Sequence, residues 1–170
     1  MRLMQEYEAV SAVPGNALRN QGKGLAAEIQ KILGALELAN IPAGCQESYD
    51  HWLDQTTTEI LSQLKAEGRS WGAVRKALNL FMRACICDHY LRGEYQLDQI
   101  EPFAEIPLDS VVSKALRRLA GRGKLRAWDT LKQLTPQENQ KYQAFAAEQA
   151  KNLGVPARVY VDNLLWLKNR

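Results

Sequence analysis

The sequence is poor in cysteine and histidine, the residues that most often mark metal sites and nucleophilic catalysis. Its 170 residues include three cysteines and two histidines, and none of them has a recognised metal-ligand spacing. Cys85 and Cys87 are two positions apart in a predicted helix, so they point about 200° apart. We therefore expect no metal site. An odd number of cysteines without a secretory signal indicates free thiols in a reducing compartment.

Long apolar runs are also missing. No run approaches the roughly 20 residues that span a bilayer. The N-terminal stretch is acidic by its sixth residue, Glu6, which is unlike a signal peptide. The sequence therefore predicts a cytoplasmic protein with no membrane partner, associated with the nucleoid if its source is prokaryotic.

The net charge of +3 is unevenly distributed along the chain. Residues 111–134 carry seven basic residues and one acid, so this segment has a charge of +6 and the rest of the chain −3. The basic residues are Lys114, Arg117, Arg118, Arg122, Lys124, Arg126 and Lys132. One basic segment on a slightly acidic protein is typical of a surface that binds a polyanion. A solvated helix face would give the same pattern.

Almost every segment has the apolar periodicity of a helix. Predicted helices cover 2–13, 22–40, 48–66, 73–90, 110–120, a short stretch around Trp128 and Leu131, 136–153 and 160–168, and 92–108 is a polar loop. Ser48, Asp109 and Thr135 stand at predicted N-caps. With no alternating strand pattern and no repeat, we expect an all-α, single compact domain of about seven or eight helices over 1–170.

Three segments carry residues suited to chemistry. Residues 72–83 place Lys76 in the first turn of an apolar helix after a glycine turn. Residues 105–110 place Asp109 at a helix start after Pro107, and residues 159–166 place Asp162 and Trp166 one helical turn apart.

Lys76 has several neighbours that lower a lysine pKa. The helix dipole, the nearby Arg75 and Arg83, and partial burial all disfavour the charged amine. A neutral amine is a nucleophile toward electrophilic carbon. A lysine that extends its ammonium group to solvent at a helix end has the same sequence pattern.

The two aspartates each have a structural and a functional interpretation. Asp109 is a common N-cap, and an ionised carboxylate fixed there also stabilises positive charge on a sugar. Asp162 and Trp166 share a helix face, where an aromatic plane stacks a purine and a carboxylate accepts its N–H groups. A core tryptophan with a helix-start aspartate is the simpler explanation.

In this order, the three segments resemble the helix–hairpin–helix DNA glycosylase superfamily, and most closely its archaeal 8-oxoguanine (GO) branch. That branch has a lysine beginning an apolar helix, with a phenylalanine five residues later and a basic residue seven later, as do Lys76, Phe81 and Arg83 here. Its I-P-x-D segment corresponds to residues 106–109, and its C-terminal aspartate, leucines and tryptophan to residues 162–166. The resemblance covers 68–170, after N-terminal helices in 1–67. The hairpin G-[VI]-G motif is absent, and residues 70–72 stand in its place.

The resemblance implies a minimal glycosylase fold and a bifunctional DNA glycosylase and AP lyase that excises a damaged base such as 8-oxoguanine. Lys76 would attack the sugar C1′ and form a Schiff base, and Asp109 would assist, with Arg83 as its counter-charge. Asp162, Trp166 and Arg83 would hold the base flipped out of double-stranded DNA. The basic residues other than Lys132 would bind backbone phosphates. No cofactor is needed, and a monomer is favoured. If Lys76 and Asp109 form a single site, their side chains must lie within about 8 Å of each other.

Two other interpretations stay open. A helical module could bind DNA or RNA through residues 114–132 without chemistry, or the chain could be an interaction protein from a phage or a defence locus. Trapping of an imine separates the enzyme from both alternatives. Salt-dependent DNA binding separates the binding module from the interaction protein.

Overall fold

The computed structural model describes residues 1–168, with side chains through residue 165, and this part of the chain contains no strand. The α-helices are α1 (Arg2–Ala12), α2 (Leu25–Leu33), α3 (Gln46–Gln63), α4 (Trp71–Cys87), α5 (His89–Glu94), α6 (Ser110–Ala120), α7 (Pro136–Leu153) and α8 (Val161–Lys168). Short 3-10 segments are η1 (Leu38–Asn40), η2 (Leu97–Gln99), η3 (Glu101–Phe103), η4 (Leu131–Gln133) and η5 (Arg158–Tyr160). The all-α prediction is confirmed.

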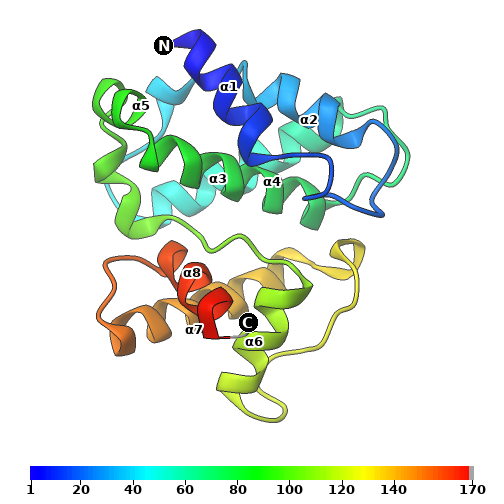
Figure 1. Cartoon of the computed structure of the whole chain (residues 1–170), viewed down its shortest axis with the longest axis vertical. Coiled ribbons are helices and arrows are strands. Elements are labelled where there is room, and N and C mark those ends of the chain that lie inside the picture. The colour runs from blue at the N-terminus through cyan, green and yellow to red at the C-terminus, as the bar shows by residue number, and fades with distance from the viewer. Residues whose placement is uncertain (169–170) are drawn as a thin grey trace.

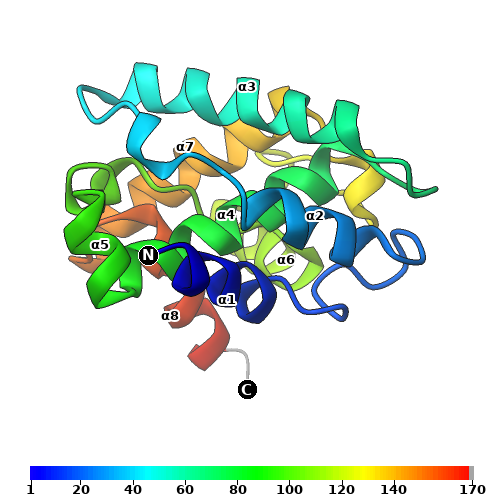
Figure 2. The same cartoon turned by 90° about the horizontal axis from the view of Figure 1, so that it is seen from above.

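The helices form two tiers (Figure 1). Helices α1 to α5 make one tier, α6 to α8 make the other, and an extended segment, residues 104–109, runs between them. Helix α4 is central, since it packs against α1, α2, α3, α5 and η4. Figure 2 shows α3 along one side of the molecule, with α1 and α8 along the opposite side.

The sequence of α4 explains its central position. Val74, Ala77, Leu78 and Phe81 are fully buried, and they repeat at the three- and four-residue spacing of one helix face. The helix begins earlier than its apolar pattern predicts. The Ser70 side chain accepts a hydrogen bond from the Ala73 backbone N–H and so caps the start of α4. Lys76 therefore lies in the second turn, not in the first, and the helix dipole acts on it less than the sequence suggests.

Several predicted boundaries were wrong because local caps end or begin helices inside the apolar pattern. Helix α2 ends at Leu33, where Gly34 caps it, rather than at 40. Helix α3 begins at Gln46 with Cys45 as its N-cap, and Ser48 is the third helical residue of its capping box. The predicted loop 92–108 contains the end of α5 and the two 3-10 segments η2 and η3. Helix α5 forms because the Asp88 side chain caps its start by accepting hydrogen bonds from two backbone N–H groups.

The caps nearest the three segments follow the sequence. Asp109 accepts hydrogen bonds from the backbone N–H groups of Val111 and Val112 and begins α6. Thr135 accepts from the Glu138 N–H and begins α7, with Pro136 at the first helical position. Both helix starts are therefore fixed by short-range hydrogen bonds that the sequence alone predicts.

Candidate active site

Lys76 and Asp109 meet at the boundary between the two tiers. The Lys76 Nζ lies 3.7 Å from the Asp109 Oδ2, so the prediction that the two side chains lie within about 8 Å is confirmed. The same Nζ donates a hydrogen bond of 2.8 Å to the Ala17 carbonyl oxygen. Only 11% of the Lys76 side chain is exposed, whereas 34% of Asp109 is. The amine is thus held in place, and the carboxylate is open to a ligand.

A buried ion pair places Asp109 opposite Lys76. Arg75, beside Lys76 on α4, makes a two-point contact with Glu105, with Nε–Oε2 and Nη2–Oε1 distances of 2.9 and 3.1 Å. Asn79 and Asn139 donate further hydrogen bonds to the same carboxylate. Burial disfavours the charged form of Glu105, but Arg75 holds its pKa below the usual range. The residue before Lys76 therefore anchors the segment that ends at Asp109.

Side chains from the second tier fix the rest of this extended segment. The Gln143 amide accepts from the Ile106 N–H and donates to the Ile106 carbonyl, as a neighbouring strand would. The Arg158 guanidinium donates to the carbonyl oxygens of Phe103 and Ala104. These contacts satisfy backbone groups that no helix pairs, and they leave Asp109 little freedom to move away from Lys76.

Burial lowers the pKa of the Lys76 amine, because the charged form loses solvation. Asp109 opposes this effect through its charge and a hydrogen bond, and Asp162 opposes it through its charge. The lowered pKa increases the fraction of neutral, nucleophilic amine at a given pH. Burial, rather than the cationic neighbours expected from the sequence, is the main cause.

Asp162 belongs to the same charged cluster. Its carboxylate accepts a hydrogen bond of 2.7 Å from Arg83, and this is an ion pair. Burial raises the pKa of Asp162, and Asp109 raises it further, while Arg83 and Lys76 lower it. The expectation that Arg83 is the counter-charge of Asp109 was wrong. Arg83 is seven residues beyond Lys76 on α4, about 10 Å along the axis, where α8 brings Asp162 to it.

The remaining predicted site residues lie apart from this cluster or outside the described side chains. The Trp166 side chain lies outside the described part. Lys114, Arg118, Arg122, Lys124, Arg126 and Lys132 are exposed, and Arg117 is half-buried. Lys114, Arg117 and Arg118 line a surface hollow of about 270 Å³ on α6. This hollow begins about 8 Å along the helix axis from Asp109.

A cavity of about 380 Å³ adjoins Lys76 and Asp109, and sequence analysis missed two of its lining residues, Gln21 and Trp128. Both side chains are buried, although they lie in segments between the helices. Gln21 carries no sequence signal, because its place depends on how residues 16–21 pack on α4. Trp128 stood out only as an apolar residue of a predicted short helix. That helix is η4, which begins three residues later.

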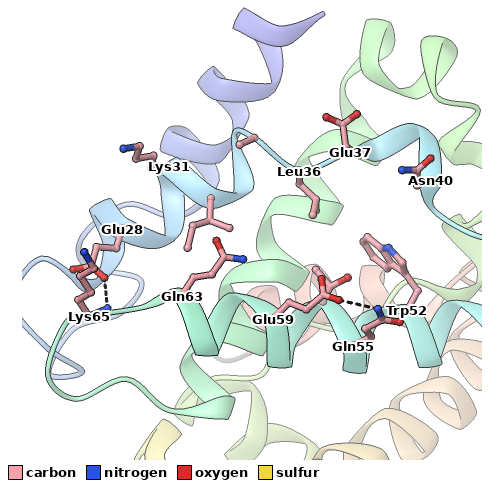
Figure 3. A pocket seen from close by; sticks show the side chains of 13 residues that line it. Glu28, Lys31, Leu36, Glu37, Asn40, Trp52, Gln55, Glu59, Gln63 and Lys65 are labelled. Atoms are coloured by element: carbon pink, nitrogen blue, oxygen red, sulfur yellow. Dashed lines mark hydrogen bonds between the residues drawn. The ribbon is translucent and has the colours of Figure 1, made fainter.

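A larger hollow lies away from Lys76 and Asp109. A groove of about 860 Å³ runs between α2 with η1 on one side and α3 on the other (Figure 3). Leu36 and Trp52 contribute apolar surface, and the Glu59 carboxylate at its edge accepts a hydrogen bond from Gln55. None of the predicted site residues with described side chains lines this groove. Size alone therefore does not locate the chemistry.

No family model, curated protein or solved structure matches this chain. Among the described residues, no group of three or more His, Cys, Asp or Glu side chains is placed to hold a metal ion. None of the described helices is long and apolar enough to cross a membrane. The charged cluster and the cavity beside it are therefore the basis for a functional proposal.

Proposed function

We propose that this protein is a DNA glycosylase with AP-lyase activity that removes a damaged base through a Schiff base on Lys76. The observation that carries the proposal is the Lys76–Asp109 contact. The buried Lys76 amine, whose pKa is lowered, lies 3.7 Å from the Asp109 carboxylate. It brings together residues 33 positions apart that the motif resemblance pairs. The substrate would be double-stranded DNA with the damaged base, such as 8-oxoguanine, flipped out of the stack.

The chemistry begins with a neutral Lys76 amine. Its lone pair forms a bond to C1′ as the bond from C1′ to the base breaks, and the base leaves with the electron pair and is protonated. Asp109 stabilises the positive charge that develops on the sugar. The nitrogen then loses a proton, the C1′–O4′ bond breaks with its electron pair going to O4′, which takes up a proton, and the C1′ imine forms. Removal of a C2′ proton then expels the 3′ phosphate and nicks the strand.

The Arg83–Asp162 pair supports the proposal less directly. Asp162 acts on the reacting amine through its charge and raises the pKa of Lys76, and Arg83 pairs with Asp162. In the glycosylase scheme this pair, with Trp166, contacts the flipped base. Its hydrogen-bond capacity is partly used within the pair, so it would position the base rather than read its edge.

A second function is favoured by the exposed basic residues of 114–132. A module that binds DNA or RNA without chemistry needs this surface but no nucleophile. In that case Lys76 and Asp109 form a structural ion pair at a helix start. The two functions differ in one measurable product, a covalent enzyme–DNA adduct. An interaction protein from a phage or a defence locus would show neither the adduct nor salt-dependent DNA binding.

The deciding experiment is borohydride trapping on a duplex carrying 8-oxoguanine or an abasic site. The parent protein should form a stable adduct and nick the strand. Lys76→Gln should abolish both, because it keeps a polar side chain of similar length but removes the amine. DNA binding should survive, since phosphate contacts supply most of the affinity.

Lys31→Gln is the matched control, because it makes the same change at an exposed lysine on α2. This variant should trap like the parent. A parent protein that never traps, or a Lys76→Gln variant that still does, would reject the enzyme and leave the binding module.

A further inference from the structure

The outer face of α1 carries an apolar stripe that the described part of the chain leaves exposed. Leu3, Tyr7 and Val10 are 81%, 68% and 57% exposed. They are four and three residues apart, which places them on one face of the helix. The opposite face of α1 packs against α2 and α4. Single exposed apolar residues are common on folded proteins, but a contiguous apolar patch is typical of a contact surface.

The groove between α2 with η1 and α3 is a concave surface of the same kind (Figure 3). Leu36 and Trp52 give it apolar walls, and the Trp52 ring stacks on the buried Tyr49, with ring centres 5.7 Å apart. Thr56 also lines the groove and is only 4% exposed, yet none of the described residues forms a hydrogen bond with its hydroxyl. Polar groups at such depth are usually paired, so we expect the groove to be covered.

The stripe and the groove have matching lengths. The α3 side chains that line the groove run from Trp52 to Gln63, about 16 Å along the helix axis. Helix α1 has 11 residues, so it is also about 16 Å long. An amphipathic helix laid into an apolar groove is a recurring mode of recognition, and its anchors have the spacing of this stripe.

The groove has an acidic end and a basic end (Figure 3). The end near Trp52 is acidic, with Glu37 and the Glu59 carboxylate. The other end has a net charge of +1, from Glu28, Lys31 and Lys65. An occupant that is positive at one end and negative at the other therefore complements the groove.

Helix α1 has this order of charges. Its one cation, Arg2, lies in its first turn, and its acids, Glu6 and Glu8, follow. The helix dipole has the same sense, positive at the N-terminus and negative at the C-terminus. Arg2 pairs with Glu6 on the exposed surface, and such a pair changes partners at little cost. With the start of α1 at the acidic end of the groove, each end of the helix meets opposite charge.

Within one copy of the protein, the stripe does not reach the groove. Gln5, on the inner face of α1, donates hydrogen bonds to the carbonyl oxygens of Leu33 and Leu36. These bonds hold α1 at the end of α2, and Figure 2 shows α2 between α1 and α3. The stripe therefore points away from its own groove. A helix α1 that fills the groove has to come from another copy.

We propose that this protein associates head to tail, with the α1 stripe of one copy in the groove between α2 and α3 of the next. Because the two surfaces differ, the contact is heterologous, and added copies form a closed ring or an open chain. Such an assembly differs from the monomer that the resemblance favours. The proposal does not rest on the proposed function, since neither surface includes Lys76 or Asp109.

Sedimentation of the full chain over a concentration series, without DNA, tests the stripe. One helix in a groove is a small interface, so we expect the parent to associate at about 1–100 μM. The stripe variant, Leu3→Gln with Tyr7→Gln, should associate at least tenfold more weakly, because two apolar side chains are no longer buried in the contact. Both positions are exposed, and glutamine is a good helix former, so the fold is kept.

The matched control for the stripe is Tyr90→Gln with Leu119→Gln. It replaces one exposed tyrosine and one exposed leucine on α5 and α6, away from the stripe. This control should associate like the parent. A control that loses association to the same degree would mean that general surface apolarity drives it, and would overturn the proposal.

The groove variant is Ala35→Arg with Glu59→Arg. Both positions are exposed and line the groove, so two long cations there obstruct it and reverse the charge of its acidic end. Association should weaken at least tenfold. Ala144→Arg with Glu148→Arg is the matched control, since it makes the same two changes at exposed positions on α7. It should associate like the parent.

A mixture of the stripe variant and the groove variant gives the deciding result. The first keeps an intact groove and the second an intact stripe, so neither should associate alone. Together they should form a one-to-one pair that grows no further, because each copy retains one working surface. Native mass measurement counts the copies. A parent that stays monomeric up to about 1 mM, a stripe variant that still associates, or a mixture that forms no pair overturns the proposal.

Discussion

At Lys76, burial and Asp109 act on the amine in opposite directions. Burial lowers its pKa and the carboxylate raises it. The acid limb of the trapping rate should therefore lie below the range of an exposed lysine, near 10.4, because the free amine forms at lower pH. Asp109→Asn removes the raising effect, so the limb should move to still lower pH. The rate at the plateau should fall about 10²-fold, since a transition-state charge loses its stabiliser.

The Asp109→Asn variant keeps the helix cap, because the asparagine Oδ1 accepts the same backbone hydrogen bonds. Asp129→Asn is its control, as Asp129 is an exposed acid at the same cavity and not a cause of the Lys76 shift. Rates of borohydride trapping measured between pH 5 and 10 give the acid limb for the parent and for each variant. A limb that stays in place, or moves to higher pH in Asp109→Asn, would show that the carboxylate does not act on the attacking amine.

At the scale of elements, the start of α4 depends on a close approach by η4. A Cβ at Gly72 would lie 2.2 Å from the Leu131 carbonyl oxygen and 2.9 Å from the Leu134 Cβ. Gly72→Ala should therefore destabilise the protein by about 1–3 kcal/mol, the usual effect of overpacking. For a chain of this size, that lowers the melting temperature by roughly 2–4 °C per kcal/mol. Thermal unfolding followed by circular dichroism measures the shift.

Gly93→Ala is the control in a second helix, α5. Position 93 is exposed, and a Cβ there meets nothing within 4 Å. Alanine is the better helix former, so this variant should gain about 0.5–1 kcal/mol. If both variants change stability in the same direction, helix propensity rather than the contact with η4 dominates at Gly72.

Helices α2, α4 and α6 show how far the sequence predicts the elements. The apolar stripe of α4 and the Asp109 cap of α6 follow from local patterns, and both were predicted. The ends of α2 and the helical turns in 92–108 were not, because caps at Gly34 and Asp88 act against the longer apolar pattern. Periodicity reports which face is buried. It does not predict where a helix begins or ends, because capping groups there take over the hydrogen bonds of the backbone.

The whole molecule decides which predicted residues meet. Lys76 and Asp109 were expected to form one site, and they do so because Arg75 and Glu105 bind the extended segment to α4. Neither Arg75 nor Glu105 was assigned this role, since a buried ion pair between residues 30 apart leaves no local pattern. The partner of Arg83 and the lining of the cavity depend on the same tertiary packing. Motif spacing thus predicts the reactive groups, and packing determines their neighbours.

The distribution of charge over the whole molecule makes a prediction about DNA binding. Residues 111–134 carry a charge of +6 on a remainder of −3, and Arg118 and Lys124 are exposed. The triple variant Arg117→Ala, Arg118→Ala, Lys124→Ala should weaken binding to all duplex sequences alike, because phosphate contacts carry no sequence information. The plot of log K against log salt should become shallower by about 0.9 for each phosphate that the variant no longer neutralises.

Lys31→Ala, Lys141→Ala, Lys151→Ala removes the same charge from exposed lysines on α2 and α7, outside the basic segment. Fluorescence anisotropy with an undamaged duplex over a series of salt concentrations gives the slope for each protein. If the basic segment lies along the DNA backbone, only the first triple variant loses slope, because counterions are released only where cations contact phosphates. A slope reduced equally in the two triple variants would mean that net charge alone attracts DNA. A slope unchanged from the parent in both would mean that residues 111–134 are a solvated face.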